Sequence, residues 1–169
     1  MQQTSSPPPM PIAEVPVSSP GQTRIAKACE KHWGAHYYNC SGFVRAVATE
    51  IDISYPPADW KQANPIIKHI SAWETASWWK IGSPEKAGTL AEEGYFVLAC
   101  LTSEDSKNPK DTNGHVVVVT SGYKPEHHIY PRGYWGTYLS VGKKNATMNW
   151  AFEKGDRDKV TYYRCMWKR

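Results

Sequence analysis

The chain has 169 residues, of which 40% are hydrophobic and 21% are charged, and its formal net charge is +4 at pH 7. This composition excludes a disordered chain, and the length suits one domain with its own core rather than two. The 20 basic residues are dispersed among 16 acidic ones, so the sequence lacks the basic stripe of a nucleic-acid-binding protein, and no run approaches the roughly 20 apolar residues of a membrane span.

Residues 1–22 differ in composition from the rest of the chain. They carry six of the 13 prolines and no aromatic residue, which is typical of a flexible, polyproline-like leader. The segment also lacks the basic start and the apolar run of a secretory signal peptide. We therefore predict a flexible leader over residues 1–22, a single globular domain over residues 23–169, and synthesis in the cytoplasm without a signal peptide.

Four segments after the leader show the three- and four-residue apolar spacing of helices, each behind a polar residue that can cap its first turn. The predicted helices cover residues 24–33 behind Thr23, residues 40–51 behind Asn39, residues 64–70 with Asn64 as cap, and residues 83–94 with Ser83 as cap. In the last two segments a proline follows the cap, which is a further start signal.

After Gly94 the apolar pattern changes from that of helices to that of strands. The predicted strands are YFVLACL (residues 95–101), HVVVVTSG (115–122), TYLSV (137–141) and VTYYRCMW (160–167). The first is a continuous apolar run and the second contains four consecutive valines, so we expect both at the centre of a sheet. Helices first and strands afterwards favour an α+β fold, with the N-terminal helices packed on an antiparallel sheet.

The stretch NCSGFV places Cys40 in the first turn of the second predicted helix. Backbone N–H groups at a helix start favour a thiolate and can donate hydrogen bonds to a developing oxyanion. The small residues Ser41 and Gly42 leave room for a substrate backbone beside the sulfur. The alternative is an inert cysteine packed in the core, which is the commoner fate of a cysteine on an amphipathic helix.

A cysteine that cleaves an amide also needs a base, and His115 is the best candidate. It opens the strand HVVVV directly after a loop that ends in Asn113-Gly114, and strand ends commonly face clefts. A histidine before a strand is usually a surface or edge residue, so the position alone does not establish a catalytic role.

Together, NCSGFV and GHVVVV resemble the signature of NlpC-type papain-like cell-wall peptidases, in which a Cys-Ser-Gly-Phe-Val helix start faces a Gly-His-Val strand start. The longer blocks NCSGFVRAVATEI, NGHVVVVTSG and GDRDKVTYY are similar to the first family of type VI secretion amidase effectors. The likeness runs from about Ile25 to about Tyr163. It implies an NlpC-type papain-like fold and hydrolysis of the peptide stem of peptidoglycan, at the γ-D-glutamyl-meso-diaminopimelate bond.

The resemblance also implies roles for individual residues. Cys40 falls on the nucleophile and His115 on the general base, with no metal or organic cofactor. NlpC-type enzymes usually have a polar residue that orients the histidine about a dozen positions further along, and here that spacing falls on His127. Its neighbour His128 is an equal alternative.

The family further implies an antibacterial toxin that is exported by type VI secretion and acts in the periplasm of the target bacterium. We expect a monomer whose partners are peptidoglycan and a dedicated periplasmic immunity protein that blocks the groove. Two alternatives stay open. One is a non-catalytic module that binds cell wall through its Trp and Tyr residues, and the other is an acyltransferase that uses the same Cys40 and His115.

The remaining polar residues, cysteines and aromatic residues are expected to have structural roles. We expect surface or core positions for His32, His36 and His69, a charged turn at residues 156–158, an inert Cys100, and core packing for Tyr134 and Trp135, with a place at the groove rim as the alternative for the last two. Whether Cys29 pairs with Cys165 is left open by the sequence.

Overall fold

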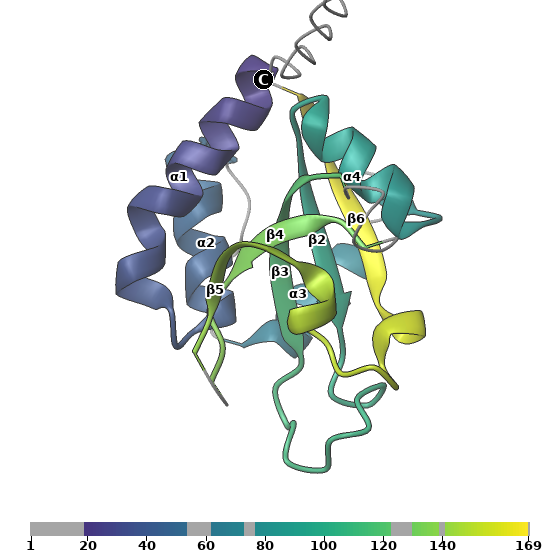
Figure 1. The fold of residues 1–169 in the computed structure, drawn as a ribbon. Coiled ribbons are helices and arrows are strands. Elements are labelled where there is room, and N and C mark those ends of the chain that lie inside the picture. Colours follow the sequence, from purple (N-terminus) through teal and green to yellow (C-terminus); the bar gives the residue numbers. More distant parts are fainter. Residues whose placement is uncertain (1–18, 54–61, 73–76, 123–129, 139–140, 169) are drawn as a thin grey trace, which may run out of the picture.

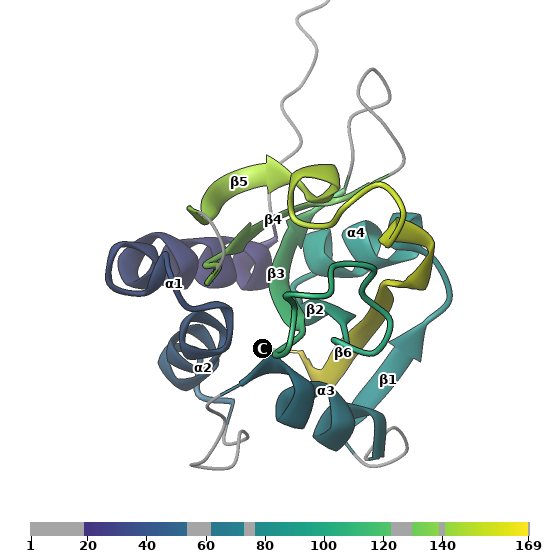
Figure 2. The same cartoon turned by 90° about the horizontal axis from the view of Figure 1, so that it is seen from below.

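The protein folds as a six-stranded antiparallel sheet with helices against both of its faces (Figures 1 and 2). The computed structural model describes residues 19–53, 62–72, 77–122, 130–138 and 141–168. The α-helices are α1 (Pro20–His36), α2 (Cys40–Glu50), α3 (Ala63–Ala72) and α4 (Pro84–Glu92). The strands are β1 (Trp78–Ile81), β2 (Tyr95–Leu101), β3 (His115–Ser121), β4 (Arg132–Trp135), β5 (Lys143–Thr147) and β6 (Thr161–Lys168). Two short 3-10 helices, η1 (Met148–Trp150) and η2 (Arg157–Lys159), connect β5 to β6.

The strand order is β1-β6-β2-β3-β4-β5, so β2 and β3 lie at the centre, as the sequence predicts. Side chains of these strands alternate between two cores. Leu98 and Val116 pack with α1, α2 and α3, whereas Val97 and Val117 pack with α4 on the other face. Figure 2 shows α2 and α3 on one side of these strands and α4 on the other. The expected α+β class, with helices on an antiparallel sheet, is confirmed.

Helix α2 is fixed against the sheet by its apolar face. Phe43, Val44 and Val47 have no exposed surface, and the burial of each contributes about 1.5–3 kcal/mol. The packing of α2 against β3 brings the first turn of the helix close to the first residues of the strand.

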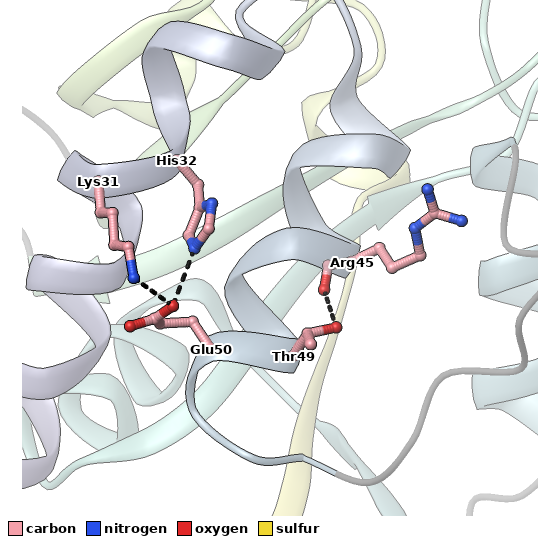
Figure 3. Close-up of polar contacts among 5 residues, drawn as sticks. All are labelled: Lys31, His32, Arg45, Thr49 and Glu50. Carbon is pink, nitrogen blue, oxygen red and sulfur yellow. Dashed lines mark hydrogen bonds and ion pairs between the residues drawn. The ribbon is translucent and has the colours of Figure 1, made fainter.

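An ion-pair cluster joins α1 to the far end of α2. Lys31 and His32 of α1 both contact the Glu50 carboxylate, at 2.8 and 3.2 Å (Figure 3). His32 thus lies at a helix–helix contact on the surface, which is one of the two kinds of position predicted for it.

Helix α1 begins at Pro20, four residues earlier than the predicted start at residue 24. The Ser19 hydroxyl accepts a hydrogen bond from the Gln22 N–H (3.2 Å), and Pro20 occupies the first turn, so the cap is Ser19 and not Thr23. The same cap–proline signal was recognised at Ser83, where the structure confirms it. At Ser19 it was hidden by the proline-rich composition of the leader. Residues 1–18 lie outside the described part of the chain, so the predicted leader stays a prediction.

The predicted strand over residues 137–141 is wrong for its described residues, and β4 and β5 flank this segment instead. The N–H groups of Thr137 and Gly142 donate to the Tyr37 carbonyl, at 3.0 and 3.1 Å. The segment is thus held on the turn between α1 and α2 rather than on a neighbouring strand. Strands β1 and β4 have four residues each and β5 has five, which is too short for an alternating pattern to stand out in the sequence.

Candidate active site

Cys40 is the first residue of α2, and Asn39 holds the turn around it. The Asn39 side-chain oxygen accepts hydrogen bonds from the Gly42 N–H (2.9 Å) and the Ser41 hydroxyl (3.0 Å), which confirms the predicted cap. A Cβ atom at Gly42 would lie 2.7 Å from the Asn39 side chain, so the cap requires glycine there. The first N–H groups of a helix have no intrahelical acceptor, and the Cys40 thiol therefore lies beside donors that can stabilise negative charge.

Opposing effects act on the pKa of the Cys40 thiol. Burial raises the pKa, while backbone hydrogen bonds from Val116 and Ser41 lower it, and the negative charge of Asp111 raises it further. Burial is the largest effect, so the net pKa lies above its usual value. A helix start alone therefore does not produce a thiolate here, and the thiol needs a base. The hydrogen bond from Val116 also places the sulfur beside the residue that follows His115.

His115 begins β3, where it pairs with Leu101 at the end of β2. Its half-buried ring lies edge-on to the Phe152 ring, with 5.4 Å between the centroids. Burial lowers the pKa of His115 to about 4, and the negative charge of Asp111 opposes this shift. The imidazole is therefore neutral at pH 7, which is the protonation state of a general base.

The turn before His115 is clamped by Asn64 at the start of α3. The Asn64 side chain accepts from the Ser103 N–H (3.0 Å) and donates to the Ser103 hydroxyl (2.7 Å) and the Thr112 carbonyl (3.3 Å). Its backbone N–H donates to the Asn113 carbonyl (2.8 Å). The prediction that Asn64 caps this helix is wrong, because α3 begins at Ala63 and the side chain holds the β2–β3 loop instead.

Gly114 makes the last bend before His115, and its replacement is expected to destabilise the protein. Its φ of +73° disfavours any residue with a Cβ atom, which here would also lie 2.5 Å from the Asn64 side-chain oxygen and 2.7 Å from the Leu101 carbonyl. We predict that Gly114→Ala lowers the free energy of unfolding by about 1–2 kcal/mol or more. Urea denaturation measures this loss.

Gly34 provides the matched control for that substitution. It lies in α1, and no atom is found within 4 Å of a Cβ built on it, so Gly34→Ala should raise the free energy of unfolding by about 0.5–1 kcal/mol. Equal stability of the Gly114→Ala protein and the wild type would contradict the account of this turn.

Cys40 and His115 line one cavity of about 400 Å³. The fold therefore brings together the two predicted residues, one from α2 and one from β3. The β2–β3 loop forms one wall, and the segment between η1 and η2 forms another. The charged residues on its walls are Lys110, Asp111, Glu153 and Asp156. A cavity of this size, with a thiol, a neutral imidazole and helix N–H groups, has the parts needed for nucleophilic attack on an amide.

The aromatic residues at the cavity differ from those that the sequence suggested. Phe152 and the largely exposed Tyr138 line it. Tyr134 is buried and donates a hydrogen bond to Glu30 (2.8 Å), and Trp135 is 2% exposed, so their predicted core packing is confirmed. Sequence reasoning missed Phe152, because a contact between residues this far apart leaves no local pattern.

Residues 156–158 are more than a charged turn, and that simple prediction needs correction. Asp156 is 1% exposed and accepts hydrogen bonds from the Lys107 N–H (3.0 Å) and the Ser106 hydroxyl (3.4 Å). The Arg157 guanidinium donates to the carbonyls of Asn149 and Phe152. This segment therefore fixes two walls of the cavity, and the signal for it was the shared block GDRDKVTYY.

Other predicted residues lie away from the cavity or outside the described residues. His127 and His128 belong to residues 123–129, which the structure does not describe. His36 and His69 are half-buried on α1 and α3, and Cys100 is fully buried in β2. Cys29 and Cys165 are both buried in the core that packs against α1–α3.

The described residues contain no cluster of three His, Cys, Asp or Glu side chains that could hold a metal ion. None of the described helices is long and apolar enough to span a bilayer.

The sequence is similar to a protein of established activity. No family model matches the chain. The peptidoglycan amidase Tse1 of Pseudomonas aeruginosa is 31% identical to it over 153 residues, which cover 82% of this chain and 87% of Tse1. A match that covers 82% of this chain spans both the α2 start and the β3 start. The chain therefore belongs to the Tse1 family, the first family of type VI secretion amidase effectors.

Proposed function

We propose that the protein is a cysteine-dependent peptidoglycan amidase that hydrolyses the γ-D-glutamyl-meso-diaminopimelate bond of the peptide stem. One observation carries the proposal: Cys40 at the start of α2 and His115 at the start of β3 line the same cavity in a chain that is similar to a peptidoglycan amidase. The bond itself is taken from the resemblance to the effector family.

The reaction would begin with transfer of the Cys40 thiol proton to the neutral His115 imidazole. The thiolate then attacks the γ-carbonyl carbon of D-glutamate, and backbone N–H groups at the start of α2 bind the oxyanion. Collapse of this intermediate breaks the amide bond, and the diaminopimelate amine leaves with the proton from His115. A thioester remains on Cys40.

Water completes the cycle. His115 takes one proton from the attacking water, the thioester C–S bond breaks, and that proton passes to the Cys40 sulfur. D-glutamate is released as the γ-carboxylic acid, which loses its proton to solvent. No step requires an oxidant, a reductant or a cofactor. The general base contributes about 10²–10⁴-fold to such a reaction, and one oxyanion donor about 10²–10³-fold.

The cavity walls suit a peptide stem that carries both carboxylates and an amine. Lys110 can pair with a carboxylate, and Glu153 lies where it can attract an ammonium group. We propose that a cognate immunity protein occupies this same cavity, because a protruding loop there would exclude the substrate.

The proposed site of action is tested by directing the protein to two compartments of a Gram-negative host. Periplasmic expression is expected to lyse the cells, co-expression of the immunity protein encoded beside it should rescue them, and cytoplasmic expression should be tolerated. Peptidoglycan is absent from the cytoplasm. Killing from the cytoplasm, together with a harmless periplasmic form, would rule out a wall amidase.

His127 remains a proposed orienting residue on the strength of the family spacing alone. We predict that His127→Ala lowers kcat less than His115→Ala does, because water or a backbone carbonyl can partly replace a residue that only orients the base. Steady-state hydrolysis of stem peptides measures the difference. Wild-type turnover in this variant would remove His127 from the site and direct attention to His128.

A further inference from the structure

Asp111 lies in the β2–β3 loop and contacts the turn that leads into His115. Its Oδ1 accepts hydrogen bonds from the N–H groups of Asn113 (3.1 Å) and Gly114 (2.9 Å). The same side chain lines the cavity that holds Cys40 and His115. A single carboxylate oxygen thus binds both residues that immediately precede the histidine.

The geometry of this turn does not by itself require a negative charge. An asparagine side chain offers the same acceptor oxygen and forms the same kind of turn. A neutral side chain with the same acceptor oxygen would therefore hold the turn equally well, and no Lys or Arg of the described residues forms an ion pair with this carboxylate at the cavity wall.

Several titratable and charged groups line the cavity that holds His115. Cys40 approaches from α2, Lys110 and Asp111 from the β2–β3 loop, and Glu153 and Asp156 from the segment between η1 and η2. The Asp156 carboxylate is engaged by Lys107 and Ser106. Asp111 raises the pKa of His115 against the effect of burial, and it also raises the pKa of Cys40. It is thus one charge that acts on both members of the pair.

We propose that Asp111 is a positioning residue for His115: its carboxylate holds the turn that presents the imidazole, and its negative charge stabilises the imidazolium that forms when His115 accepts the Cys40 proton. This inference rests on the proposed Cys40–His115 chemistry. No covalent step involves Asp111, which acts through His115 throughout.

Two substitutions separate the geometric role of Asp111 from its electrostatic role. Asp111→Asn keeps the acceptor for Asn113 and Gly114 but removes the charge, whereas Asp111→Ala removes both. Loss of a nearby negative charge lowers the pKa of an imidazolium and of a thiol alike, so both limbs of the pH profile of kcat/KM should move to lower pH in Asp111→Asn, by about one pH unit. Asp111→Ala should lose roughly tenfold more kcat than Asp111→Asn, since a mispositioned base loses rate as well.

Asp105→Asn is the matched control, because Asp105 lies in the same loop, is exposed, and contacts Thr102 rather than the cavity. Its pH profile should coincide with that of the wild type. A second readout, the NMR titration of the His115 imidazole, should show the same shift to lower pH in Asp111→Asn even without turnover.

The inference would be overturned if Asp111→Asn had the same pH profile of kcat/KM and the same His115 titration as the wild type. This outcome does not depend on whether Asp111→Ala folds. Equal kcat in folded Asp111→Ala and Asp111→Asn would overturn the geometric part. Failure of the proposed function is distinguishable, because it would appear as hydrolysis by Cys40→Ala, while the imidazole titration does not depend on activity.

Discussion

Replacement of Cys40 with alanine is expected to abolish amide cleavage, with kcat/KM falling by about 10⁴-fold or more, because no other group can form the thioester. The fold should survive the change. Cys40 is half-buried at the first position of α2, and alanine is a strong helix former. Release of new amino groups from purified peptidoglycan measures the activity, and circular dichroism verifies the fold.

Cys100→Ala is the matched control for loss of a thiol. Cys100 is fully buried in β2 and belongs to the same core against which Cys40 packs, and burial raises the pKa of its thiol well above the usual value. This variant should lose about 1 kcal/mol of stability and keep its turnover. Substantial hydrolysis by correctly folded Cys40→Ala would eliminate the mechanism.

Replacement of His115 with alanine is expected to lower kcat by about 10²–10⁴-fold, the usual contribution of a general base. The substitution should also slow alkylation of Cys40 at neutral pH. Burial already raises the pKa of this thiol, and without an imidazole to accept its proton the thiolate becomes rarer still. The pH dependence of Cys40 alkylation by iodoacetamide measures this effect.

His32→Gln controls for the loss of an imidazole elsewhere. His32 contacts Glu50 at the α1–α2 surface and does not line the cavity, so its replacement should leave both turnover and alkylation unchanged. If alkylation of Cys40 had the same pH dependence in His115→Ala as in the wild type, the two residues could not form a pair.

The sequence best predicts those elements that are determined by residues adjacent in the chain. The apolar run YFVLACL matches β2 residue for residue, and Asn39 and Ser83 cap their helices as expected. Errors occurred where a distant partner decides the structure. Asn64 reads as a helix cap, yet its side chain binds a loop some forty residues away, at Ser103.

The candidate site was predictable only in part. The flanking sequences place Cys40 at a helix start and His115 at a strand start, as the structure has them, whereas the catalytic roles proposed for both come from the resemblance to cell-wall peptidases. Asp111 and Asp156 could not be found this way, since an acidic residue in a polar loop looks solvated until its acceptor contacts are known. Nor could the sequence show that burial outweighs the helix start in setting the pKa of Cys40.

Mass spectrometry of peptidoglycan fragments tests the central claim most directly. Purified peptidoglycan is digested with the wild type and with Cys40→Ala, and the soluble products are sequenced by fragmentation. The account predicts two products from the wild type: glycan-linked stems that end in D-glutamate, and peptides with a free diaminopimelate amine. The summed mass of the two products exceeds that of the parent stem by one water. Cys40→Ala should yield neither product. Intact stems with cleaved glycan, or the same fragments from folded Cys40→Ala, would contradict it.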